Sequence, residues 1–316
     1  MNFTFDQIKD ALSRAQNIII ITHQKADGDA CGSALAMTHY LQSLGKNVSI
    51  FCDGGAPKYF DFLPGFHNIS GDKTVLQNNW DTALFLDCGD LANSNVSKGE
   101  LNGAHIINID HHYSNDKYGK INYIDPRASS ACEIINKFFL SIGFNIDKKI
   151  STCLLTGILT DTHAFTNGAT SLNAIETASS MVKRGARIHI SVDHYFKNKS
   201  LNSLKLWGEI LSRLKINKKY SIAYTYIADD DFKKFAVKPE EADGIINFMN
   251  SLTGIKACFV VRQQELTTKI SMRTNNNNID LTMFANLFGG GGHKKAAGFT
   301  YKYPIGVDNG KLIISC

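Results

Sequence analysis

The sequence predicts an α/β fold: a parallel sheet with helices on both faces, followed by a second, smaller α/β domain. Three apolar runs in the first half, residues 17–21, 82–87 and 104–110, are short, rich in β-branched side chains and separated by helical patterns. Such runs are typical of parallel strands that are buried on both faces. After residue 215 the pattern changes to strands at 220–226, 255–262 and 267–273, and the last two predict a hairpin.

Helical periodicity surrounds these strands. The first helix is predicted over 5–15 and the next over 34–44, where Gly45 stops it, and a short strand follows at 47–52. Further helical patterns cover residues 129–143, 149–160, 171–184, 200–215, 238–251 and 279–287. We therefore place a first domain at 1–190, a linker helix region at 191–215 and a second domain at 216–316, and we expect the active site in the cleft between the domains.

Composition excludes several classes of protein. The 316 residues are 43% hydrophobic and 20% charged, which is typical of a globular protein with a sizeable core. The net charge of +5 is mild, and no apolar run approaches the ~18 residues that a membrane span needs. We see no signal peptide, and the seven cysteines are scattered without a Cys-x-x-Cys pair. These features predict reduced thiols, a cytoplasmic location and no membrane partner.

Polar side chains of one kind follow each predicted parallel strand. Because the carboxyl ends of parallel strands meet at one edge of a sheet, we expect these side chains to converge. Four carboxylates at one site would repel one another without cations. The pattern therefore predicts two divalent ions with one bridging carboxylate. Oxygen and imidazole ligands without thiolates suit Mn²⁺ or Mg²⁺, and imidazole favours Mn²⁺. The residues concerned are His23, Asp27, Asp29, Asp87, Asp110, His111 and His112 after the strands, and Asp161 after a helical segment.

The stretch 22–33 has a simpler interpretation when it is taken alone. Asp27 would cap a helix, Asp29 would sit in the first helical turn, and His23 would be an ordinary polar residue. In the metal interpretation, Gly28 lets the chain turn tightly between the two carboxylates. Only the recurrence of the same chemistry after the other strands favours the metal site.

Four segments in this order resemble the successive motifs of the DHH phosphoesterases. The resemblance implies that one ion is held by His23, Asp27 and Asp87, and the other by Asp29, Asp87, His111 and Asp161. It further implies that Asp110 orients His111, that His112 faces the scissile phosphate, and that a metal-bound hydroxide hydrolyses the ester. His112 would stabilise the phosphoryl oxygens or protonate the leaving group, and both roles stay open. The segments are residues 22–29, 86–87, 109–112 and 157–161.

The second half contains an unusual run of four glycines, followed by His293 and two lysines. Four glycines in a packed domain cost folding entropy, so we expect close backbone approach to an anion; the alternative is a flexible surface loop. Arg273 at a strand end could make a bidentate contact with phosphate through its guanidinium group. Together, residues 270–274 and 289–298 resemble the DHHA1 domain, which clasps the nucleotide. The implied substrate contacts are His112, Arg273, Gly290, Gly291, Gly292 and His293.

The two motif sets together resemble the stand-alone nanoRNases of the DHH family. That resemblance implies hydrolysis of very short RNA to mononucleotides and of adenosine 3′,5′-bisphosphate to AMP, with no long nucleic acid as partner. The alternatives are a phosphodiesterase for cyclic di-AMP or linear diadenylate, and a catalytically inactive nucleotide-binding regulator. The oligomeric state stays open, with a homodimer as one alternative. One departure is His163, which stands where the family pattern leads us to expect glycine.

Overall fold

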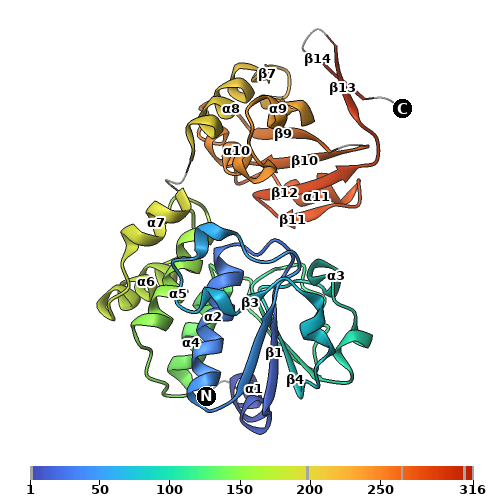
Figure 1. Ribbon diagram of the computed structural model, residues 1–316. Helices are drawn as coiled ribbons and strands as arrows, with labels where there is room; N and C mark the ends of the chain where they lie inside the picture. The colour runs from blue at the N-terminus through green and yellow to red at the C-terminus, as the bar shows by residue number, and fades with distance from the viewer. Residues whose placement is uncertain (1–2, 197–198, 265, 309–310, 315–316) are drawn as a thin grey trace. The chain divides into compact units, whose positions relative to one another are not determined.

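The computed structural model describes residues 3–196, 199–264, 266–308 and 311–314 (Figure 1). The chain forms two compact units, Met1–Asn198 and Lys199–Cys316. No helix among the described residues is both long enough and apolar enough to cross a membrane. The predicted α/β class with two domains is confirmed.

The first unit is built on a six-stranded, fully parallel sheet in the order β3-β2-β1-β4-β5-β6. The order reverses between β1 and β4, and in such sheets a crevice forms there, outside the carboxyl ends of the strands. The three predicted strands of the first half correspond to β1, β4 and β5. The strands are β1 (Asn17–Ile21), β2 (Asn47–Phe51), β3 (Ile69–Ser70), β4 (Thr82–Leu86), β5 (His105–Asp110) and β6 (Ile121–Ile124).

Apolar side chains cover both faces of this sheet. On β1, Ile18 and Ile20 join the larger core with α2, α4 and α5, whereas Ile19 and Ile21 join a smaller core on the other face. Figure 1 shows α2, α4 and α5 on one side of the strands and α3 on the other. The helices are α1 (Phe3–Arg14), α2 (Gly28–Ser43), α3 (Leu91–Ser94), α4 (Ala131–Ser141), α5 (Lys148–Asp161), α6 (Leu172–Lys183) and α7 (Ile188–Phe196), with 3-10 turns at Lys58–Phe60, Phe66–Asn68, Lys73–Gln77 and Lys98–Leu101.

Several elements of this unit differ from the sequence expectation, and the short strand β3 and the short helix α3 are among those that were not predicted. Helix α2 begins at Gly28 rather than near residue 34, because the side chain of Asp27 accepts hydrogen bonds from the backbone of Asp29 and Ala30. Helix α7 was not predicted. Strand β6 was not predicted either, and none of its residues is fully buried, so it lacks the apolar pattern that marks the central strands.

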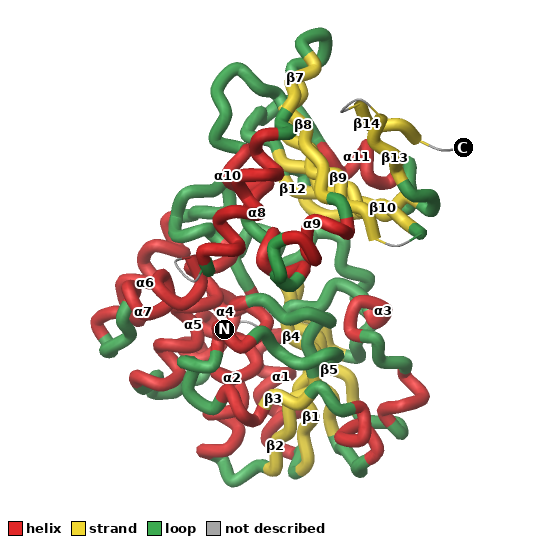
Figure 2. The backbone as a smooth tube through the Cα atoms, turned by 45° about the horizontal axis from the view of Figure 1, so that its top comes forward, coloured by secondary structure: helices red, strands yellow, loops and turns green. Residues whose placement is uncertain are grey.

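The second unit contains a mixed six-stranded sheet in the order β11-β12-β10-β9-β8-β7, coloured yellow in Figure 2. Strands β8 and β9 are parallel, and the other neighbours are antiparallel. The predicted hairpin is confirmed, because β9 and β10 pair directly. The strands are β7 (Lys215–Asn217), β8 (Ile222–Ile227), β9 (Ala257–Gln264), β10 (Thr267–Arg273), β11 (Gly291–His293) and β12 (Ala296–Tyr301), with a separate pair β13 (Ile305–Asp308) and β14 (Lys311–Ile314).

Helices pack on both faces of the second sheet. Leu206 and Ile210 of α8 belong to one core, and Leu281 and Ala285 of α11 belong to the other. The single helix expected over 238–251 is instead a 3-10 turn and a short helix, interrupted at residues 243–244. The helices are α8 (Leu201–Ser212), α9 (Asp229–Lys234), α10 (Ile245–Met249) and α11 (Leu281–Asn286), with the 3-10 turn at Pro239–Ala242.

Candidate metal centre

The carboxyl ends of β1, β4 and β5 bring the predicted polar residues together. His23 lies just beyond β1, Asp87 directly follows β4, and Asp110 is the last residue of β5. The Nε2 atom of His23 lies 3.5 Å from Asp87 Oδ2. The Nε2 atom of His111, which follows Asp110, lies 3.4 Å from Asp87 Oδ1. Each oxygen of the Asp87 carboxylate therefore faces a different imidazole.

The six predicted metal ligands fall into two groups around Asp87. His23, Asp27 and Asp87 each place a ligand atom within 4.8 Å of the others. Asp29, His111 and Asp161 do the same, and His111 Nε2 lies 3.2 Å from Asp161 Oδ2. The partition implied by the family resemblance places Asp87 in both sets, whereas in the structure Asp87 lies in the first group and in a further group with Asp110, His111 and His112. The assignment of these residues as ligands stays a prediction.

The donor atoms fit divalent cations. Asp87 is almost fully buried, yet its Oδ1 atom accepts no hydrogen bond of normal geometry, and the imidazole nitrogens of His111 and His112 lie 3.4 and 3.6 Å away. A buried carboxylate oxygen without a partner is costly, and a bound cation would remove that cost. Asp87 also has a φ of +52°, an unfavourable backbone conformation for a residue other than glycine. The set contains only imidazole and carboxylate donors, which suits Mn²⁺ or Mg²⁺ better than thiolate-seeking metals.

Like charges inside this site shift the acidity of its members. Burial, followed by the charge of Asp87, raises the pKa of Asp29 to about 7. Burial and then the charge of Asp29 raise the pKa of Asp161. Burial lowers the pKa of His23 and His111, but neighbouring carboxylates outweigh it, so both pKa values are raised. Without cations, bound protons therefore compensate part of the negative charge.

Asp29 is held by the start of a neighbouring helix. Its Oδ2 atom accepts a hydrogen bond from Ala131 N at 2.6 Å, and its Oδ1 atom accepts one from Cys132 N at 2.9 Å. These donors lie in the first turn of α4, where the helix dipole favours a negative charge. Asp29 itself sits in the first turn of α2, so it joins the two helices and points between them.

Two glycines let the helices that carry these acids approach closely. A Cβ atom on Gly28 would overlap the side chain of Thr160 in α5. A Cβ atom on Gly157 would overlap Cys132 and Asp29. The expectation that Gly28 serves a tight turn is therefore wrong: it lies at the start of α2, has no positive φ and is needed for packing.

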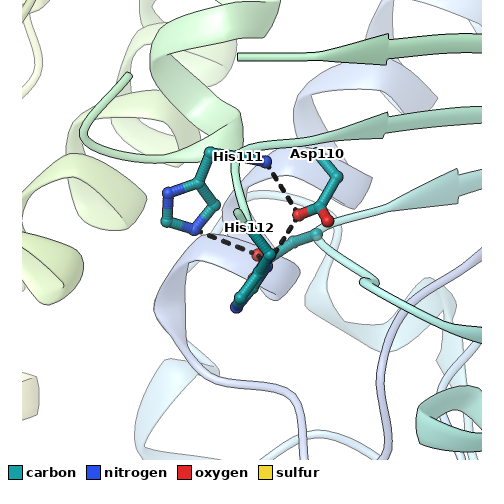
Figure 3. Close-up of side chains that lie close together, drawn as sticks. Asp110, His111 and His112 are labelled. Atoms are coloured by element: carbon teal, nitrogen blue, oxygen red, sulfur yellow. Dashed lines mark hydrogen bonds and ion pairs between the residues drawn. The ribbon is translucent and has the colours of Figure 1, made fainter. Parts of the chain in front are cut away.

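Asp110 supports the following histidine pair, but not in the way expected (Figure 3). Its Oδ1 atom accepts a hydrogen bond from the backbone of His111 at 2.8 Å and lies 2.7 Å from Nδ1 of His112. The sequence resemblance led us to expect that Asp110 orients the His111 ring, whereas its carboxylate engages the ring of His112. Burial raises the pKa of Asp110, but the hydrogen bond from His112 outweighs it and the pKa is lowered.

Asn115 holds Asp110 in turn, and this residue was not predicted from the sequence. Its Nδ2 atom donates to Asp110 Oδ2 at 2.6 Å and to Asn108 Oδ1 at 2.8 Å. Asn108 is fully buried in β5 and donates to the backbone of Cys88. A buried asparagine in an apolar strand was a signal of such a network, because buried polar groups need partners. Its partner could not be read from spacing alone.

The segment after Asp161 is strained. His163, Ala164 and Phe165 have φ values of 49°, 53° and 65°, a left-handed conformation that side chains disfavour. This explains why the family pattern leads to glycine at 163, since glycine adopts positive φ without cost. His163 belongs to no group of potential metal ligands found among the described residues.

The predicted substrate contacts of the second half lie together on the second sheet. Arg273 in β10 and His293 in β11 both pair with Ala296 of β12. Directly paired residues of antiparallel strands point to the same face, so these side chains flank a small alanine. One step along, Gly291 and Ser271 both pair with Gly298 on that face. The result is a nearly bare strip of sheet bordered by a guanidinium and an imidazole.

Packing explains most of the glycine run. A Cβ atom on Gly290 would overlap Gly298 and Phe299, and one on Gly292, whose φ is +135°, would overlap Ala296. Only Gly291 has no atom within 4 Å of its missing side chain and no positive φ. Of the three glycines expected to approach an anion, Gly291 is therefore the one without a structural reason. The Arg273 guanidinium donates to Asn247 Oδ1 at 3.0 Å and to its own strand's Met272 O.

Comparison with known proteins agrees with both halves of the chain. Residues 17–158 match the family model described as DHH family, N-terminal domain, and residues 219–311 match the DHHA1 domain. The bifunctional oligoribonuclease and PAP phosphatase NrnA of Thermus thermophilus is 28% identical over 285 residues, which are 90% of this chain and 84% of that protein. The protein of the same name from Bacillus subtilis is 26% identical, over 91% of this chain and 90% of its own.

A solved structure shows the same architecture. The crystal structure of an exopolyphosphatase-related protein from Bacteroides fragilis superposes with a TM-score of 0.86 at 25% sequence identity, covering 94% of this chain and 90% of that one. Its likeness extends over both units. With a DHH domain over residues 17–158 and a DHHA1 domain over residues 219–311, the chain belongs to the DHH-family phosphoesterases.

Proposed function

We propose that the chain hydrolyses very short oligoribonucleotides to mononucleotides and adenosine 3′,5′-bisphosphate to AMP, with two divalent cations as cofactor. The observation that carries the proposal is a pair of neighbouring ligand groups: one contains the buried carboxylate of Asp87, and the other contains His111, whose Nε2 atom lies 3.4 Å from Asp87 Oδ1. The printed names of the relatives, oligoribonuclease and PAP phosphatase, support the choice of substrates. We assign the chemistry to residues 1–190 and nucleotide binding to residues 216–316.

Mn²⁺ is our preferred ion, with Mg²⁺ as the alternative. His23 and His111 supply two imidazoles beside four carboxylates, and this mixture favours Mn²⁺ over the more oxygen-selective Mg²⁺. His23, Asp27 and Asp87 would hold one ion, and Asp29, Asp87, His111 and Asp161 the other. When bound, the ions would activate a water molecule and stabilise charge on the phosphoryl oxygens.

His112 and Asp110 provide the proton chemistry of the site. The Asp110 carboxylate at 2.7 Å favours a proton on Nδ1 of His112, which directs Nε2 to the substrate. Burial lowers the pKa of His112, but the hydrogen bond to Asp110 outweighs it and the pKa is raised. A protonated ring can donate to a phosphoryl oxygen or protonate the leaving oxygen, and we keep both roles.

The bare strip of the second sheet supplies a place for the phosphate end of the substrate. Arg273 and His293 flank Ala296, and Gly291 exposes its backbone beside Gly298. Short side chains allow a ribose-phosphate to lie against the strands, and the guanidinium can contact the phosphate oxygens. We place the reaction in the reducing cytoplasm, where the six described cysteines, all buried and free, would stay reduced.

A hydrolysis panel tests the proposal. Purified protein with Mn²⁺ is incubated with diadenylate, a longer RNA, adenosine 3′,5′-bisphosphate and cyclic di-AMP, and products are separated by chromatography. We expect rapid turnover of diadenylate and the bisphosphate and slow attack on the other two. Faster opening of the cyclic dinucleotide would replace our substrate order with a cyclic-dinucleotide phosphodiesterase. Tight nucleotide binding without turnover of any substrate would instead support an inactive regulator.

A further inference from the structure

A pocket of about 330 Å³ opens beside the candidate metal centre within the first unit. One wall consists of His112 and of three predicted ligands, His23, Asp27 and Asp87. The remaining lining residues, which we call the amide wall, are Gln24, Gly89, Asp90, Asn93 and Ser114. No function described above uses the amide wall.

The chemistry of the amide wall indicates what it can bind. The described residues that line the pocket include no lysine or arginine, so a second phosphate would find no counter-charge there. They include no aliphatic side chain, phenylalanine, tyrosine or tryptophan, so a base would find no stacking surface on this wall. Two amides, a hydroxyl and a carboxylate are suited to uncharged groups that donate and accept hydrogen bonds.

The amide wall is held in place by its own hydrogen bonds. Asp90 caps α3, where its Oδ1 atom accepts from Asn93 N at 2.7 Å and its Oδ2 atom accepts from Asn93 Nδ2 at 2.9 Å. The backbone of Gln24 donates to Asn93 O at 2.7 Å. The loops after β1 and β4 are therefore tied together. A carboxylate has about four acceptor sites, so Asp90 can accept further donors from a ligand.

We propose that the amide wall binds the ribose next to the scissile phosphate and that Asp90 accepts a hydrogen bond from its 2′-hydroxyl. The inference rests on the proposed function, because the phosphate must lie against His112 and the ligands on the other wall. Carboxylates bind ribose hydroxyls in this way in dinucleotide-binding folds, and the 2′-hydroxyl is the group that distinguishes RNA from DNA. The pocket thus makes the enzyme selective for ribonucleotides.

The test compares diadenylate with its 2′-deoxy counterpart in the intact protein. We expect the wild type to have a kcat/KM at least roughly tenfold higher for the ribonucleotide, the size expected for one hydrogen bond to a charged acceptor. Asp90→Asn keeps the helix cap, because asparagine caps as well as aspartate, but it weakens the acceptor. This variant should lose most of the preference, chiefly through slower turnover of the ribonucleotide. Asn93→Ala should reduce the same preference less.

Asp72→Asn is the matched control, because Asp72 caps the 3-10 turn Lys73–Gln77 outside the pocket and accepts from Thr74 N. It should leave the ribose preference unchanged. A direct readout is calorimetric binding of AMP and 2′-deoxy-AMP to wild type and to Asp90→Asn. Equal rates on both dinucleotides in the wild type, or an unchanged preference in Asp90→Asn, would overturn the inference while the proposed function stands. Failure to hydrolyse either dinucleotide would instead overturn the proposed function.

Discussion

The two candidate sites of this protein are built in opposite ways. At the strand ends of the first unit, Asp29 and Asp87 are buried. The Nε2 atom of His111 lies 3.9 Å from Asp29 and 3.4 Å from Asp87, and that of His23 lies 3.5 Å from Asp87. On the second sheet, Gly291 and His293 are exposed, and the strip between Arg273 and His293 is bare. One site concentrates charge inside the protein, and the other offers exposed backbone and the His293 imidazole to solvent beside the half-buried Arg273.

The difference teaches which ligand each site can accept. Buried carboxylates repel one another, so the first site is stable only with protons or cations among them. The second site has mostly small side chains and two basic groups. It therefore has room for a large anion. A phosphoester bound to cations needs both kinds of surface.

Removal of the carboxylate between the two ligand groups is expected to have the largest effect. Asp87→Asn should lower kcat/KM by far more than the roughly 10–100-fold typical of a lost supporting partner, because Asp87 belongs to one ligand group and lies 3.4 Å from His111 of the other. Hydrolysis of diadenylate and calorimetric Mn²⁺ binding would measure it. Asp81→Asn, at a carboxylate that binds the backbone of Gln16 and Asn17 elsewhere, is the control. Unchanged turnover in Asp87→Asn would contradict the two-ion site.

Acidification should weaken metal binding at the first site. The pKa of Asp29 is raised to about 7, and those of His23, His111 and Asp161 are also raised, so these groups carry protons below their pKa values. Because bound protons must leave before the cation binds, affinity is full above these pKa values and is lost as the pH falls through them. Titrations between pH 8 and pH 6 should show a loss of roughly tenfold per pH unit for each proton displaced. A pH-independent affinity would argue against these residues as ligands.

Asn115 tests the support of His112. Asn115→Ala removes the 2.6 Å hydrogen bond to Asp110, so we expect kcat to fall by roughly 10–100-fold with little change in KM. Asn122→Ala, which removes hydrogen bonds to Gly119 only, is the matched control. Steady-state kinetics on diadenylate with Mn²⁺ would show the split. If both variants behave alike, Asn115 does not act through Asp110.

The glycines of the run in the second site have separable roles: Gly290 serves packing, and Gly291 is expected to serve binding. Gly290→Ala should lower the free energy of unfolding by about 1–3 kcal/mol, since its Cβ atom would overlap Gly298 and Phe299. Gly291→Ala should change stability by less than about 0.5 kcal/mol, because nothing lies near its new methyl group, but it should raise KM for adenosine bisphosphate several-fold. Denaturant titration and kinetics would measure both. An unchanged KM in Gly291→Ala would remove this strand from the binding site.

The smallest effect concerns backbone strain beside Asp161. Ala164→Gly should raise the free energy of unfolding by up to about 1 kcal/mol, because glycine adopts the φ of +53° without steric cost. Ala11→Gly in helix α1 should instead lower it by about 1 kcal/mol. Thermal or denaturant unfolding would compare them. Equal destabilisation by the two variants would show that the left-handed segment stores no strain.

Local pattern was enough for the central strands of the first unit and for the residues at their ends. β1, β4 and β5 appear as apolar runs because strands buried on both faces admit little else, and carboxylates or imidazoles after such runs are conspicuous. The start of α2 at Gly28 was missed, although Asp27 is a good cap, because the same residue was interpreted as a ligand. The structure shows that its side chain caps the helix and also lies in a ligand group.

The sequence alone determined which elements and donor residues the protein has: a parallel sheet, a second domain, and donors at the strand ends that would meet at one edge. What only the tertiary structure decided is how each donor is held. Asp29 rests on the first turn of α4, Asp110 engages His112 and is held by Asn115, and Gly28 makes room for Thr160. These contacts join segments more than a hundred residues apart, and local periodicity carries no information about such distances. The amide wall beside the metal centre arises in the same way, from loops that only folding brings together.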